Sequence, residues 1–269
     1  MEEVVLRKIL DENTLIVEVI NENIHKLPFV ISIPHSGVYV TKEMNNKLKE
    51  NVILANMDWY LPQLYSFLKE LGFTVVINHV SRYVIDPNRD IKSADGEEYT
   101  KSFIYKKTTF GREMYRDTLL QEEIDDRINK YYKVYHDTLQ RTISEKLVHF
   151  EKAYLLDLHS FGRQMEVDVV LGNNEGQTMK EELLSYIQKL FMDNGFDVAI
   201  NYPFKGGYIT KHYGDKNQRC ESLQIELSYS SYIDKRVFPE EELPLINENV
   251  MKDCREKLKK IFHEIGKIG

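Results

Sequence analysis

The chain of 269 residues has few cysteines and no long apolar run. Its two cysteines, Cys220 and Cys254, show no CxxC spacing, so we expect buried structural thiols and neither a disulfide framework nor a thiolate metal site. No apolar stretch approaches the ~20 residues that cross a bilayer. The acidic start, Met1-Glu2-Glu3, lacks the basic and apolar regions of a signal peptide. These absences predict a reduced, cytoplasmic protein without a membrane partner.

The chain also lacks an excess of positive charge. It carries 36 Lys and Arg against 43 Asp and Glu, a formal net charge of −7, and its basic clusters are short. Such a surface repels nucleic acid, so we expect no nucleic-acid partner. No linker rich in Pro, Gly or Ser and no internal repeat divides the sequence. With 42% hydrophobic residues for a core, residues 1–269 are predicted to form a single domain. The oligomeric state stays open.

Short apolar runs alternate along the chain with longer stretches of helical periodicity. Alternation of this kind predicts an α/β sandwich of three layers, in which helices flank a central, mostly parallel or mixed sheet. Ligands of such sheets lie beyond the carboxyl ends of the strands. The expected strands are 29–33, 73–77, 153–158, 167–171, 197–200 and 223–227, and the expected helices are 58–71, 113–150 (one helix or two), 178–194 and 239–266.

Two histidines follow predicted strands. His35 lies in the turn Pro34-His35-Ser36-Gly37, and His159 ends the apolar run that begins at residue 153. Asp157 shares a strand face with His159, because residues two apart on a strand point the same way, and it could orient a metal-bound imidazole. The alternatives are a turn histidine bonded to backbone for His35 and a satisfied buried histidine for His159.

Two arginines flank the apolar stretch in SRYVIDPNRD, residues 81–90. The planar guanidinium of Arg82 or Arg89 can hold a carboxylate through two parallel hydrogen bonds, and Asn88 adds a neutral donor. A surface salt-bridge cluster is the alternative, since Asp86 and Asp90 are nearby.

Glu226 lies in a predicted strand with apolar neighbours. A carboxylate is costly to bury there without a partner or a catalytic task, and a solvent-facing edge position is the alternative. Two histidines and a carboxylate can bind zinc and leave a position for water. A separate glutamate can move the water's proton, and an arginine can stabilise an oxyanion. The inventory suits hydrolysis of an N-acyl amino acid.

At these residues the sequence resembles the N-formylglutamate amidohydrolase family. More distantly it is similar to aspartoacylase and the zinc carboxypeptidases, which share an α/β fold with a mixed sheet between helices. The matching stretches run in the family's order over most of the chain: IPHSG (33–37), NMDWYLPQLY (56–65), SRYVIDPNRD (81–90), DLHSFG (157–162), NYPFKGGYITKHYG (201–214) and QIELSYSSY (224–232).

The resemblance implies one zinc ion per chain, with His35 and His159 as ligands and Glu226 as general base. The zinc carboxypeptidases place a glutamate three residues after the first histidine, but this chain has Val38 there. The resemblance therefore assigns the third ligand to Asp58. The alternative for Asp58 is an N-cap, because it precedes a predicted helix.

For the substrate, the resemblance implies that Arg89, with Asn88, holds an α-carboxylate. Arg82 would face the carbonyl oxygen or a second carboxylate. In residues 205–212, the paired glycines, Gly207 among them, permit a backbone close to ligand. Lys205, Lys211 or His212 would meet a side-chain carboxylate there, with a simple hairpin turn as the alternative.

Two further segments fit the family. His136 lies in a helical pattern, where a satisfied histidine between helices is expected, and residues 91–112 are expected to carry a substrate-covering loop. The leading hypothesis is an N-formylglutamate deformylase of the kind used in histidine breakdown. The alternatives are an N-acyl amino acid hydrolase or small carboxypeptidase of other specificity, and a non-catalytic metal- or ligand-binding protein on the same fold.

Overall fold

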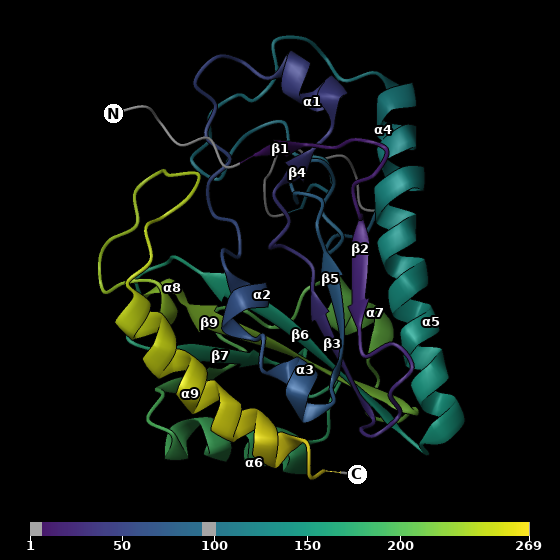
Figure 1. Cartoon of the computed structure of the whole chain (residues 1–269), viewed down its shortest axis with the longest axis vertical. Helices are drawn as coiled ribbons and strands as arrows, with labels where there is room; N and C mark the ends of the chain where they lie inside the picture. Colours follow the sequence, from purple (N-terminus) through teal and green to yellow (C-terminus); the bar gives the residue numbers. More distant parts are fainter. Residues whose placement is uncertain (1–6, 93–100, 269) are drawn as a thin grey trace.

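The computed structural model describes residues 7–92 and 101–268. Its centre is a seven-stranded mixed sheet in the order β2-β5-β3-β6-β9-β7-β8, in which β2 and β5, and likewise β7 and β9, run antiparallel (Figure 1). β1 and β4 form a separate parallel pair. The strands are β1 (Lys8–Ile9), β2 (Val17–Ile20), β3 (Phe29–Ile33), β4 (Tyr39–Val40), β5 (Thr74–Asn78), β6 (Ala153–Phe161), β7 (Val169–Gly172), β8 (Val198–Ile200) and β9 (Cys220–Ser228).

Helices cover both faces of the sheet, which confirms the predicted three-layer α/β architecture. Figure 1 shows the long column of α4 and α5 on one side and α9 with α6 on the other. The helices are α1 (Lys42–Lys47), α2 (Leu61–Leu64), α3 (Leu68–Leu71), α4 (Gln121–Arg127), the π-helical turn η1 (Ile128–Tyr132), α5 (Lys133–His149), α6 (Glu181–Asp193), α7 (Tyr208–Tyr213), α8 (Tyr229–Tyr232) and α9 (Glu248–Ile265).

Alternate side chains of each central strand enter different cores, because successive strand residues point to opposite faces. Val30 and Leu155 pack with Ile143 of α5. Their neighbours Ile31 and Leu156 belong to the larger cluster that contains the α9 side chains. Burial on both faces explains why these strands read as continuous apolar runs.

Several predicted helix boundaries were wrong. Residues 58–71 contain two short helices, α2 and α3, and the left-handed backbone of Tyr60 (φ 62) keeps the preceding residues out of α2. The helix predicted from residue 113 begins at Gln121, since Glu113 pairs with Lys107 in an isolated bridge. The last helix begins at Glu248 rather than residue 239, after an N-cap at Asn247.

Three central strands deliver polar residues to one edge of the sheet. β6 pairs in parallel with β3 and with β9, and His159 lies directly opposite Glu226 in the register. His35 follows the end of β3. In the described residues, no helix combines the length and apolar character needed to cross a membrane.

Both cysteines are free and buried, as predicted, Cys220 in β9 and Cys254 in α9. Burial raises the pKa of each thiol to about 12, so little thiolate forms near neutral pH.

We expect a water-soluble thiol reagent to label neither cysteine within minutes in the folded protein and both in denaturant. Rapid labelling of both thiols in the folded protein would contradict this packing.

Candidate active site

Three predicted metal ligands converge on one point. Oδ2 of Asp58 lies 3.0 Å from Nδ1 of His159 and 3.6 Å from Nδ1 of His35. One potential ligand atom from each residue lies within 4.8 Å of the others, and all three residues are buried. The chain thus brings together the set that the sequence proposed from three distant segments.

The second nitrogen of each histidine ring is held by a carboxylate. Nε2 of His35 lies 2.7 Å from Oδ1 of Asp86, and Nε2 of His159 lies 2.8 Å from Oδ2 of Asp157. An ionised carboxylate only accepts, so each Nε2 donates and each Nδ1 faces Asp58. The predicted contact between Asp157 and His159 is present, and Ser32 Oγ donates to Oδ1 of Asp157 at 2.6 Å.

Asp58 is not an N-cap. The cap of α2 is Tyr60, which makes no side-chain cap bond. The Asp58 backbone is instead tied to the turn after β3, since its N–H donates to His35 O at 3.2 Å and its carbonyl accepts from Ser36 Oγ at 2.6 Å. Left-handed Asn56 and Tyr60 on either side turn the segment toward the histidines.

The donor types of the set, two imidazole nitrogens and one carboxylate, suit zinc. Tetrahedral zinc with bonds of about 2.0–2.1 Å places neighbouring ligand atoms roughly 3.3 Å apart. The distances of 3.0 and 3.6 Å from Asp58 Oδ2 to the two Nδ1 atoms bracket that value. Burial would raise the pKa of Asp58, but the hydrogen bond from His159 and the charge of His35 outweigh it and lower that pKa, so the carboxylate is ionised.

Glu226 lies beside this cluster on an interior strand, so the edge-strand alternative was wrong. Its Oε1 accepts a hydrogen bond from Gln224 Nε2 at 2.9 Å. Burial raises the pKa of Glu226 to about 7, although the neighbouring charge of His159 opposes the rise. A carboxyl group with that pKa can both take and return a proton near neutral pH.

Arg82 is buried and joined to the histidine network. Its Nη2 lies 2.8 Å from Oδ2 of Asp86 and 3.0 Å from the Tyr105 hydroxyl, which also bonds to Asp86. Asp86 therefore links Arg82 to His35 and is no surface salt-bridge partner. Burial raises the pKa of Asp86, but the charges of His35, Arg82 and Arg89 lower it well below its usual range.

Asn88 and Gly207 meet at the wall of the site. The Asn88 Oδ1 accepts from the Ile209 backbone at 2.8 Å, and its Nδ2 lies 3.2 Å from His159 Nε2. A Cβ at position 207 would lie 2.3–2.5 Å from the Asn88 side chain, so only glycine permits this approach. The Gly207 N–H donates to Gln224 Oε1 at 2.6 Å. The predicted hairpin alternative was wrong, because helix α7 follows the loop.

A cavity of about 540 Å³ opens over these residues. Arg82, Asn88 and Arg89 line it, as do Lys205 and Gly207, while His212 does not. The exposed His212 ring stacks on Tyr208, with 4.9 Å between centroids.

His136 is a satisfied histidine, as predicted, bonded to the Tyr213 hydroxyl at 2.8 Å and to Pro87 O at 2.9 Å. Thr109 from the predicted covering loop lines the cavity, whereas residues 93–100 of that stretch lie outside the described residues.

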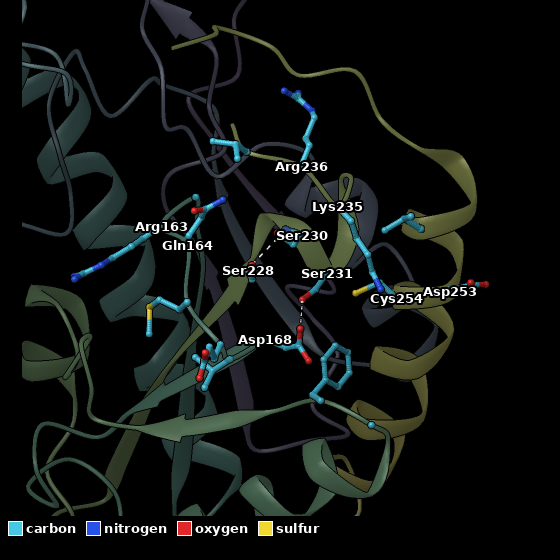
Figure 2. Close-up of a pocket in the computed structure, with 18 of the residues that line it drawn as sticks. Arg163, Gln164, Asp168, Ser228, Ser230, Ser231, Lys235, Arg236, Asp253 and Cys254 are labelled. Carbon is cyan, nitrogen blue, oxygen red and sulfur yellow. Dashed lines mark hydrogen bonds between the residues drawn. The ribbon is translucent and has the colours of Figure 1, made fainter. Parts of the chain in front are cut away.

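Sequence reasoning missed several residues in or behind the cavity. Gln224 was detectable, because it lies two residues before Glu226 on the same strand face. Asp86 was counted only as a salt-bridge partner. Arg163 carried no signal, and it also borders a second cavity of about 890 Å³, shown in Figure 2.

The family model described as N-formylglutamate amidohydrolase matches residues 27–233. The chain belongs to the N-formylglutamate amidohydrolase family. It is therefore a hydrolase that acts on an amide bond.

Two curated proteins are similar to this chain. An N-formylglutamate deformylase from Pseudomonas aeruginosa is 30% identical, over 81% of this chain and 87% of the relative. Another from Pseudomonas putida is 31% identical, over 78% and 83%. The crystal structure of an N-formylglutamate amidohydrolase from Ralstonia eutropha JMP134 shares the fold, with a TM-score of 0.76 and 23% identity over 94% of this chain and 98% of that one.

The carboxylate behind each histidine should control metal affinity. We expect Asp157→Asn to weaken zinc binding about 10- to 100-fold, because the amide no longer holds and polarises the His159 ring as an anion does. Competition against a zinc chelator measures the affinity. Asp193→Asn, which alters an exposed ion pair with Lys189, serves as the matched control. Equal zinc affinity in wild type and Asp157→Asn would remove Asp157 from the metal site.

Proposed function

We propose that the protein is a zinc-dependent deformylase, which hydrolyses N-formylglutamate or a closely related N-acyl acidic amino acid to the free amino acid. The observation that carries the proposal is the buried His35, Asp58 and His159 cluster with Glu226 beside it in the same cavity. The named relatives support the formylglutamate substrate. Cytoplasmic action in histidine breakdown is part of the same proposal.

The cluster would hold one zinc ion through Nδ1 of His35, Nδ1 of His159 and a carboxylate oxygen of Asp58. Zinc, when bound, supplies Lewis acidity that polarises a carbonyl and brings the pKa of a coordinated water toward ~7. Glu226 acts as the general base. It accepts a proton from the water that attacks the formyl carbon and returns it to the leaving amine nitrogen as the C–N bond breaks, which yields formate and the amino acid.

Arg82 would stabilise the oxyanion that develops on the formyl oxygen. Its guanidinium is already fixed by Asp86 and Tyr105, so little reorganisation is needed during the reaction. The link through Asp86 to His35 keeps this positive charge at a constant position relative to the metal ligands.

Arg89 would bind the α-carboxylate of the substrate. Asn88 lies beside Arg89 at the cavity wall. The Asn88 side-chain oxygen already accepts a hydrogen bond from the Ile209 N–H. Gly207 brings loop backbone near the substrate. Lys205 lines the cavity with its ammonium 2.6 Å from Glu175, whereas His212 lies outside the lining and would make no contact with the substrate.

The non-catalytic alternative has less support. A binding protein has no need of a buried carboxyl group whose pKa is raised to about 7 next to a metal cluster. Burying the Glu226 carboxyl group costs free energy of folding, and a role as general base accounts for its buried position.

Rates on formyl-, acetyl- and succinyl-glutamate test the acyl specificity. A formyl carbon bears only hydrogen, whereas an acetyl or succinyl group needs additional room and would misplace the carbonyl. We therefore expect kcat/KM for formylglutamate to exceed that for the other two substrates by at least about tenfold. Release of glutamate measures all three reactions equally. Turnover of only the acetyl or succinyl compound would contradict the deformylase assignment, and no turnover of any would contradict the proposed function.

A further inference from the structure

The catalytic cavity is lined by more cationic side chains than the proposed mechanism assigns a role. Five cationic side chains line it: Arg82, Arg89, Arg163, Lys205 and Lys211. Arg82 is neutralised by Asp86, and Lys205 by Glu175. The charge of Lys211 also lowers the pKa of Glu175, after the larger effects of Lys205. Arg163 also lines the cavity and has no role in the proposed mechanism.

Arg163 stands at the junction of the two cavities. It is the second residue beyond the end of β6, the strand that carries His159, and it lines both spaces. Figure 2 shows its side chain pointing away from Asp168, Ser231 and Lys235, which line the neighbouring cavity. Within residues 7–92 and 101–268, its exposed guanidinium makes no hydrogen bond or ion pair. Its five donors are available to a ligand.

The backbone before Arg163 is fixed against the site. A Cβ at position 162 would lie 2.6 and 2.8 Å from ring atoms of Tyr229, so Gly162 is required for the chain to pass this ring. The Tyr229 hydroxyl donates to Met57 O at 2.9 Å, next to Asp58. Phe161 packs on Phe204 with 5.3 Å between ring centroids. These contacts tie the start of the Arg163 side chain to the metal cluster.

We propose that Arg163 is the specificity-determining residue that binds the side-chain carboxylate of the substrate. This inference rests on the proposed function and names its substrate class, N-acyl amino acids with a second carboxylate. A guanidinium matches a carboxylate through two parallel hydrogen bonds, whereas a lysine ammonium acts as a point charge. Arg89 and Arg163 then hold the two ends of a dicarboxylate while its amide lies at the metal cluster.

Arg163→Ala tests the inference with N-formylglutamate and N-formylglutamine, which differ mainly in the side-chain charge. We expect the variant to raise KM for N-formylglutamate about 10- to 100-fold, the loss of charge-assisted bonds, with kcat little changed. The kcat/KM for N-formylglutamine should stay within about twofold, because no charged pair is lost. Arg163→Lys should fall between wild type and Arg163→Ala. Lys235→Ala is the matched control, because Lys235 lines only the neighbouring cavity.

A binding measurement separates this inference from the proposed function. Calorimetry with the products L-glutamate and L-glutamine requires no turnover. Tighter binding of glutamate than glutamine by wild type, lost in Arg163→Ala and retained in Lys235→Ala, supports Arg163 even if the acyl group is not formyl. Equal binding of the two amino acids by wild type, or an unchanged preference in Arg163→Ala, overturns it. Turnover of N-formylglutamate by the wild-type protein tests the proposed function separately, and its absence would contradict that function.

Discussion

In the middle of the sheet, β6 pairs in parallel with β3 on one side and β9 on the other. Parallel strands end at a common edge, so polar residues at their carboxyl ends meet without long connecting loops. His159 and Glu226 are direct neighbours in this register, and His35 follows the adjacent strand. A shift of one residue in the register of β6 and β9 would turn His159 or Glu226 to the opposite face of the sheet. The residues of the site would then no longer meet.

The same arrangement makes a concentrated group of buried charges tolerable. Each ionised carboxylate of the cluster has a positive or donating neighbour: Asp58 the two histidines, and Asp86 both Arg82 and His35. Burying such groups singly is costly, whereas mutual pairing restores much of the lost hydration. At Glu226 burial outweighs the hydrogen bond from Gln224 and the charge of His159, and the raised pKa prepares this group to accept a proton.

Features with local sequence signals were predictable. The apolar strands were found through periodicity, and with them the places of His35, His159 and Glu226. The Asp157 contact followed from the two-residue repeat of a strand. Asp58 required the family resemblance, since a residue before a helix reads equally well as an N-cap. Its conformation depends on left-handed Tyr60, which no local propensity indicates. The bridging role of Asp86 and the place of Arg163 depend on contacts between distant segments.

In the proposed mechanism Glu226 moves the proton while His35, Asp58 and His159 hold the metal. Zinc content and turnover, measured together on wild type and Glu226→Gln, test it most directly. We expect about one zinc per chain in both proteins, and a loss of kcat of about 10²- to 10⁴-fold in the variant. Full activity in Glu226→Gln, or wild-type protein that binds no zinc when zinc is supplied, would contradict it.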